Sequence, residues 1–136
     1  MKNKTILVVE DNDLNMKLVQ ALLRRDSYRV LASGNAEKGL DLARSEKPDL
    51  ILMDLQLPGM DGLSAIRILK KDPLLKQTPI AALTAYAMAE DLEKAREAGC
   101  DCYITKPFDI QSFAETIRKL LEEAPSASSE NPEQLP

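Results

Sequence analysis

The chain has 136 residues, 44% hydrophobic and 29% charged, which suits one compact domain. Its net charge of -4 and the lack of a dense basic run argue against binding to nucleic acid. No stretch of the sequence approaches the roughly 20 apolar residues that are needed to cross a membrane. The absence of histidine removes the usual general base near neutral pH and any zinc site with histidine ligands, so carboxylates must carry whatever chemistry the chain performs.

Five short apolar runs divide the sequence, at intervals that leave room for one helix between neighbours. In chain order they are 6–9, 28–31, 50–53, 80–83 and 102–104. Three of the runs are nearly continuous rather than alternating, which is typical of strands buried on both faces. We therefore predict an α/β fold, a doubly wound (βα)5 five-stranded parallel sheet with the flavodoxin-like strand order 2-1-3-4-5.

The segments between the runs carry helical patterns. Residues that favour helix N-caps precede three of them: Asn12 or Asp13, Asn35, and Asp109. The third helix should end just before Pro73, because the residue before a proline is pushed out of the helical region. The fourth helix, about 87–98, has Leu92 as its only large aliphatic residue, so we expect it to be held loosely.

The composition of residues 124–136 is polar, acidic and spaced by prolines. Such a segment cannot bury enough apolar surface to fold, so we expect a disordered tail after a single domain over 1–123. The two cysteines, Cys100 and Cys102, are too close in sequence to staple the fold. We expect them to be reduced, on one face of a strand, in a cytoplasmic protein.

Polar side chains follow four of the five runs, where each strand should end: Glu10, Asp11, Asp54, Thr84 and Lys106. Each alone is most simply a helix cap, a turn residue or solvated surface. In a parallel sheet, however, these strand ends meet at one edge, where ligands bind. Three carboxylates gathered there need a cation, and Mg²⁺ is the ion that carboxylates and phosphate oxygens commonly hold together. The pattern therefore predicts phosphoryl transfer, with Asp54 as nucleophile and Lys106 and Thr84 as donors.

Four segments together resemble the receiver domains of two-component response regulators, the CheY-like superfamily. They are 8–12, 53–62, 83–85 and 103–108, and the resemblance covers about 4–123. With Glu rather than Asp at position 10, the chain is similar to stand-alone, single-domain regulators of the DivK kind. The resemblance implies a phosphorelay protein that takes a phosphoryl group from a phosphohistidine on a sensor histidine kinase or a histidine phosphotransfer protein.

The resemblance also implies a role for each motif residue. Asp54 would be the phosphoacceptor, and Lys106, joined to Pro107 by a cis peptide bond, would contact the acyl phosphate. The Mg²⁺ ligands would be Glu10, Asp11, Asp54 and the backbone carbonyl of Gln56.

The same resemblance implies a switch. Thr84 would move to bond the phosphoryl group and Tyr103 would turn inward, changing the face formed by the fourth helix, fifth strand and fifth helix for a downstream protein partner. Gln56 and Tyr86 occupy the positions that tune the lifetime of the aspartyl phosphate.

Three other functions stay open at this point, and one of them is a scaffold receiver that has lost phosphorylation, although all five site positions carry competent groups. A phosphatase with an aspartyl-phosphate intermediate usually places a second Asp two residues after the nucleophile as general acid, and Gln56 cannot exchange that proton. A flavin or nucleotide module of the same topology needs amides after the first strand to cradle phosphate, whereas Glu10 and Asp11 would repel it. We expect no enzymatic activity beyond self-catalysed phosphorylation and dephosphorylation. We expect the protein to be a monomer or a weak dimer.

Overall fold

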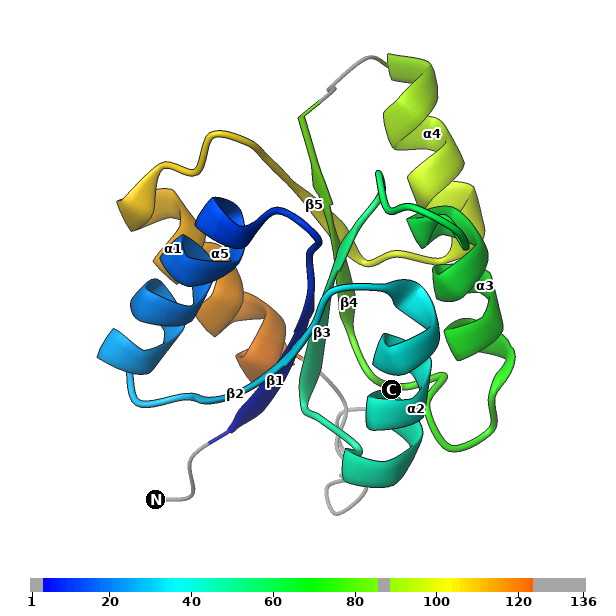
Figure 1. The fold of residues 1–136 in the computed structure, drawn as a ribbon, viewed down its shortest axis with the longest axis horizontal. Helices are drawn as coiled ribbons and strands as arrows, with labels where there is room; N and C mark the ends of the chain where they lie inside the picture. The colour runs from blue at the N-terminus through cyan, green and yellow to red at the C-terminus, as the bar shows by residue number, and fades with distance from the viewer. Residues whose placement is uncertain (1–3, 86–88, 124–136) are drawn as a thin grey trace, which may run out of the picture.

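The computed structural model describes residues 4–85 and 89–123. Within these ranges five strands alternate with five helices along the chain (Figure 1). The strands are β1 (Thr5–Val9), β2 (Arg29–Ser33), β3 (Leu50–Asp54), β4 (Ile80–Thr84) and β5 (Cys102–Thr105). The helices are α1 (Asp13–Arg25), α2 (Ala36–Glu46), α3 (Gly62–Lys71), α4 (Ala89–Ala98) and α5 (Ile110–Glu123). The predicted tail, 124–136, and Tyr86 lie outside the described residues.

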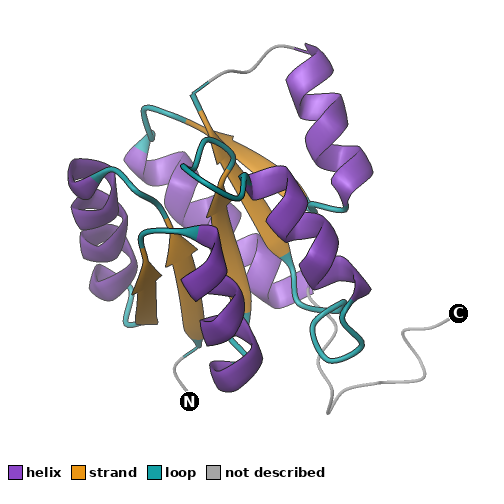
Figure 2. Ribbon diagram, turned by 45° about the vertical axis from the view of Figure 1, so that its right-hand side comes forward, coloured by secondary structure: helices purple, strands orange, loops and turns teal. Residues whose placement is uncertain are grey.

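The strands form one parallel sheet in the order β2-β1-β3-β4-β5, which confirms the predicted α/β architecture. Helices α1 and α5 cover one face, and α2, α3 and α4 cover the other (Figure 1). Seen from a second direction, the sheet is twisted between these two helical layers (Figure 2). Strands β2 and β5 are the edges, so the three inner strands are enclosed on both faces and both sides.

The continuous apolar runs are explained by this enclosure, because both faces of an inner strand pack against helices. In β1, Leu7 and Val9 pack on the side of α2 and α3, whereas Ile6 and Val8 pack on the side of α1 and α5. All five residues of β3 and of β4 are buried. The prediction that these strands are buried on both faces is therefore confirmed.

The predicted helix caps are present. Side-chain oxygens of Asn12, Asn35 and Asp109 each accept a hydrogen bond of 2.9 Å from the backbone N–H three residues later. Each such cap stabilises its helix by roughly 1 kcal/mol. Helix α3 ends at Lys71, as its proline predicted. In α4 the buried side chains among the described residues are only Ala95 and Ala98, so little apolar area anchors that helix.

The expectation that the two cysteines share a face is wrong. Cys100 packs with the cluster under α2, α3 and α4, and Cys102 packs with the cluster under α1 and α5. Strand β5 begins only at Cys102, and Gly99, at φ +112°, turns the chain just before it. Strand alternation therefore does not extend back to Cys100. Both thiols are free.

No helix within the described ranges has the length and apolar character needed to cross a bilayer.

Candidate functional site

The carboxyl ends of β1, β3, β4 and β5 lie side by side, because the parallel register aligns them. Val9 at the end of β1 pairs with Met53, and the next residue of β3 is Asp54. Asp54 pairs in turn with Leu83, and Thr84 pairs with Thr105 at the end of β5. Residues that directly follow these positions, such as Glu10 and Lys106, are thereby carried to one edge of the sheet.

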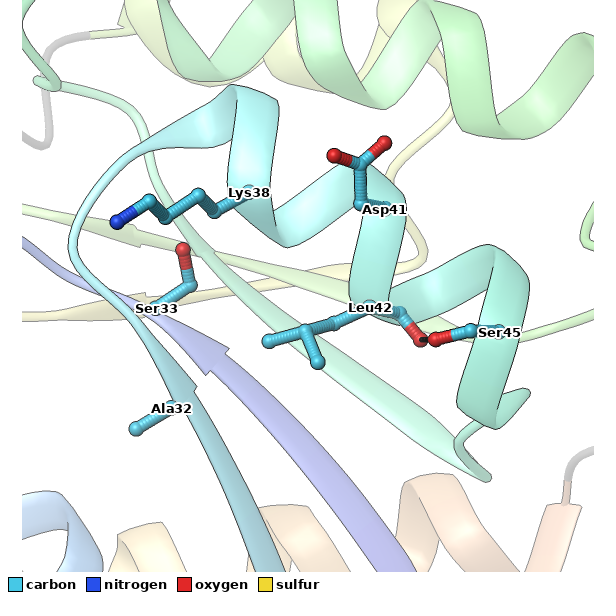
Figure 3. Close-up of a pocket in the computed structure, with 6 residues that line it drawn as sticks. All are labelled: Ala32, Ser33, Lys38, Asp41, Leu42 and Ser45. Atoms are coloured by element: carbon cyan, nitrogen blue, oxygen red, sulfur yellow. Dashed lines mark hydrogen bonds between the residues drawn. The ribbon is translucent and has the colours of Figure 1, made fainter.

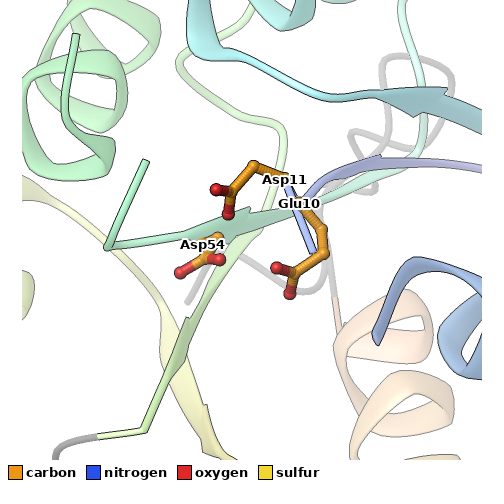
Figure 4. Close-up of side chains that lie close together, drawn as sticks. All are labelled: Glu10, Asp11 and Asp54. Carbon is orange, nitrogen blue, oxygen red and sulfur yellow. The ribbon is translucent and has the colours of Figure 1, made fainter. Parts of the chain in front are cut away.

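Three carboxylates gather at this edge (Figure 4). Glu10, Asp11 and Asp54 each place an oxygen within 4.8 Å of the oxygens of the other two. Glu10 and Asp54 are only 2% exposed, whereas Asp11 is exposed to solvent. The cluster thus has a buried floor of two carboxylates and an open rim formed by the third.

Lys106 supplies the positive charge that two of these carboxylates share. Its Nζ lies 3.0 Å from Asp54 Oδ2 and 2.9 Å from Glu10 Oε1. Burial alone would lower the pKa of Lys106, but the contacts with Glu10 and Asp54 outweigh burial and raise that pKa. Lys106 therefore remains fully charged at neutral pH.

The pKa of Glu10 is raised above its ordinary value of 4.5. Burial is the largest cause, and the neighbouring Asp54 is the second. Lys106 and the backbone N–H of Asn12 act in the opposite direction without cancelling the increase. A single lysine therefore does not fully compensate the two buried carboxylates, which is the electrostatic setting of a cation site.

Backbone amides hold one oxygen of each buried carboxylate. The N–H of Gln56 donates to Asp54 Oδ1 at 2.8 Å, and the N–H of Asn12 donates to Glu10 Oε2 at 3.1 Å. The other Glu10 oxygen, Oε1, is buried and engaged by the Lys106 ammonium. A donor set made only of oxygens, with two buried carboxylates sharing one lysine, fits a hard divalent cation such as Mg²⁺.

The site opens into a hollow of about 440 Å³. Its lining includes the three carboxylates, Lys106 and Gln56, together with Asn15 from α1 and Ala85 after β4. A second hollow of about 430 Å³ lies between β2 and α2 (Figure 3). None of the predicted site residues lines that second hollow, and its Ser33 hydroxyl is engaged with the backbone of Asn35. Of these two hollows, the first is the one whose lining combines carboxylates with a lysine, as phosphoryl chemistry requires.

The remaining predicted residues differ in their relation to the hollow. Thr84 is buried at the end of β4, and its carbonyl accepts a 2.8 Å hydrogen bond from the N–H of Lys106. The peptide bond between Lys106 and Pro107 is cis. Tyr103 is 46% exposed on β5 and does not line the hollow. Tyr86 lies in the gap between the described ranges.

Two contributors to the site were missed in the sequence, and both act through backbone atoms. The N–H of Asn12 holds Glu10, and the carbonyl of Ser33 accepts a 3.0 Å hydrogen bond from the N–H of Glu10. Every residue other than proline carries these groups, so residue identity gives no indication of them. Only the closeness of Asn12 to the acidic pair could have suggested its role.

The titration of Glu10 leads to a prediction about stability and pH. Because its folded pKa is raised, Glu10 stabilises the metal-free protein fully below pH 4.5, and this contribution is lost as the pH rises through the folded pKa. As the pH rises from 4.5 through the folded pKa, the free energy of unfolding of the wild type should fall relative to that of Glu10→Gln. Urea unfolding in chelator at several pH values measures this difference, with Glu115→Gln on the exposed side of α5 as control. Parallel pH profiles for wild type and Glu10→Gln would contradict the prediction.

Comparison with known proteins agrees with this geometry. Residues 6–118 match the model of the response regulator receiver domain. The polar-differentiation response regulator DivK of Brucella anthropi is 46% identical over 121 residues, which cover 89% of this chain and 98% of that protein. The DivK of Brucella ovis is 45% identical over the same shares.

Solved structures give the same result. A receiver domain of a sensor histidine kinase from Pseudomonas aeruginosa, which has a magnesium ion in its active-site cleft, superposes with a TM-score of 0.84 at 34% identity. The match covers 90% of this chain and all of that one. A CheY-like receiver domain protein from Methanospirillum hungatei gives a TM-score of 0.83 at 30% identity, over 90% and 96% of the two chains. The chain belongs to the response regulator receiver domain family and is a receiver of two-component signalling.

Proposed function

We propose that Asp54 accepts a phosphoryl group from a phosphohistidine on a donor protein. A carboxylate oxygen of Asp54 attacks phosphorus, the new O–P bond forms as the P–N bond breaks, and the histidine nitrogen leaves with the bonding electrons. The observation that carries the proposal is the 3.0 Å contact of Lys106 with Asp54 inside a cluster of three carboxylates. This arrangement provides a nucleophile and a fixed cation in one place.

Glu10, Asp11, Asp54 and the backbone carbonyl of Gln56 are the proposed ligands of Mg²⁺. When bound, this ion supplies positive charge for the oxygens of the transferring phosphoryl group. Lys106 then has two functions: it offsets the buried carboxylates before transfer, and it donates to the phosphoryl oxygens afterwards. Asp11 offers its carboxylate from the exposed rim of the cluster.

We also propose the switch implied by the family. Phosphorylation adds about two negative charges at Asp54. Thr84 ends the neighbouring strand, and its hydroxyl supplies a donor to the new phosphoryl group. Since Thr84 pairs with Thr105 and its carbonyl accepts from the N–H of Lys106, a shift of Thr84 reaches the end of β5, the strand that carries Tyr103. The sparsely anchored α4 would follow, changing the face of α4, β5 and α5 for a downstream protein.

The phosphoacceptor chemistry is tested by intact-mass measurement after incubation with a small phosphodonor such as acetyl phosphate. With Mg²⁺ we expect a gain of one phosphoryl group, and with chelator we expect the gain to fall by at least about tenfold, since each kcal/mol of lost charge stabilisation slows the reaction several-fold. Equal gain with and without Mg²⁺ would contradict the metal site. Steady release of phosphate from a phosphate ester would favour a phosphatase instead.

The protein donor is proposed to dock on α1 and on the start of α5, beside the site. Three apolar side chains there are exposed: Leu14, Leu18 and Ile110. Leu14 is 77% exposed and lies between Asp13 and Asn15, which line the hollow, so its burial against a helical partner would stabilise the docked complex.

Leu14→Arg should slow phosphotransfer from a phosphorylated donor protein by roughly tenfold, the effect of losing about 1.4 kcal/mol at an interface. The rate with acetyl phosphate should not change, because the site itself is intact. The matched control is Leu74→Arg, since Leu74 is 72% exposed in the loop after α3. An equal effect of the two arginine substitutions, measured by single-turnover transfer, would argue against docking at α1.

Further proposals concern the whole protein. We propose a domain over 1–123 followed by the tail, with no catalysis beyond self-catalysed phosphorylation and dephosphorylation. We also propose that Gln56 and Tyr86 tune the lifetime of the aspartyl phosphate. The proposed oligomeric state is a monomer or a weak dimer. A cytoplasmic location, with both cysteines reduced, is proposed as well.

A further inference from the structure

Gly62, the first residue of α3, lies against the main chain of the phosphoacceptor. A Cβ atom at this position would stand 2.2 Å from the backbone oxygen of Asp54 and 2.8 Å from the Cα of Leu55. Contacts of less than 3.0 Å essentially do not occur for real Cβ atoms. Both neighbours are backbone atoms, so no change of side-chain rotamer could relieve the clash.

The other glycines do not share this feature. A Cβ at Gly34 would meet nothing within 4 Å, and at Gly39 and Gly99 the nearest atoms belong to the side chains of Val9 and Lys70. At Gly59 the nearest atom is a side-chain oxygen, 3.7 Å away. Among the five glycines of the chain, Gly62 is thus the one that touches backbone, and that backbone carries Asp54.

The contact closes the loop that leads from Asp54 to α3. At the start of this loop, Leu55 N–H donates to the carbonyl of Leu83 at 3.0 Å, and Gln56 N–H donates to Asp54 Oδ1 at 2.8 Å. At its end, the side chain of Asp61 caps α3. A residue with a Cβ at position 62 would force the two ends of the loop apart by roughly 1 Å, and a misplacement of that size near reacting atoms can cost on the order of 100-fold in rate.

We propose that Gly62 is a positioning residue for phosphoryl acceptance. Because Gly62 has no side chain, the N-terminus of α3 can contact the main chain of Asp54. This contact holds Gln56 in place, so that the N–H of Gln56 orients the Asp54 carboxylate and the carbonyl of Gln56 faces the cation. This inference rests on the proposed function of Asp54 and adds to it a residue that touches neither metal nor phosphoryl group. The side-chain oxygens of the site are therefore insufficient for cation binding and phosphoryl acceptance without the close approach of α3.

The test compares Gly62→Ala with Gly99→Ala. Gly99 lies before β5, at the opposite end of the sheet, at φ +112°, so an alanine there is strained and destabilises the fold without touching the site. Both variants are assayed well below their own unfolding temperatures, for phosphoryl gain from acetyl phosphate and for Mg²⁺ affinity by titration calorimetry. Gly62→Ala should lose at least about tenfold in both properties, while Gly99→Ala keeps both. Equal values for the two variants would overturn the inference.

A measurement on the wild type covers the case in which Gly62→Ala does not fold. Labelling glycine with ¹⁵N gives one amide signal for each of the five glycines. Addition of Mg²⁺ should shift the Gly62 signal and leave that of Gly99 in place, and an unmoved Gly62 signal would overturn the inference. If the wild type neither binds Mg²⁺ nor gains a phosphoryl group, the proposed function fails and this inference fails with it, whereas failure in the glycine comparisons alone leaves the proposed function standing.

Discussion

Asp54→Asn is expected to abolish the gain of a phosphoryl group altogether. Asparagine keeps the shape of the side chain but offers only a neutral amide, which is a poor nucleophile, so the rate should fall by at least on the order of 1000-fold. The fold should be retained, because Lys106 keeps its contact with Glu10 at 2.9 Å and the buried negative charge is reduced. Intact-mass spectra after incubation with acetyl phosphate and Mg²⁺ measure the result directly.

The matched control is Asp41→Asn, which makes the same chemical change at an exposed position on α2. That variant should gain the phosphoryl group at the wild-type rate. A phosphoryl adduct on Asp54→Asn would show that another residue accepts it. Peptide mapping of the adduct would then identify the acceptor, with the neighbouring Asp11 the first to inspect.

Lys106→Met should have the second largest effect, on both activity and stability. Methionine fills a similar volume without the charge, so the transferring phosphoryl group loses a fixed donor and the rate should fall by roughly 100-fold to 1000-fold. Without metal, Glu10 and Asp54 would remain buried with no cation between them. Removing one partner of a buried ion pair costs about 3 kcal/mol or more, and we expect that loss in the free energy of unfolding in chelator.

Mg²⁺ should restore more stability to Lys106→Met than to the wild type, since in the variant the ion alone would neutralise the carboxylates. Urea unfolding with Mg²⁺ and with chelator, for both proteins, measures this difference. Lys119→Met, an equal loss of charge on the exposed face of α5, is the control and should behave as wild type. If Lys106→Met were as stable as the wild type in chelator, the ion pairs would not contribute as argued.

The sequence was sufficient for the architecture. The continuous run at 50–53 and the one at 80–83 predicted strands covered on both faces, and both strands are fully buried. The sequence placed helix starts at Asn12 or Asp13 and at Asn35, because a cap depends on the residues immediately after it, and the structure has the caps at Asn12 and Asn35. The acidic residues at 10, 11 and 54 could be expected at one edge because parallel strands share a direction, and their oxygens do lie within 4.8 Å of one another.

The sequence alone did not determine the contacts inside that edge. It did not show that Lys106 reaches Glu10 as well as Asp54, that the Asn12 amide holds Glu10, or that Gly62 lies against the Asp54 carbonyl. Nor did it place Cys100 and Cys102 on opposite faces. Helix caps, apolar strand segments and the apolar faces of helices depend on residues that are close together in the chain, so the local sequence pattern determines them. Side-chain pairing across strands and the approach of a helix to a neighbouring backbone depend on how distant segments pack, and only the tertiary structure decided those.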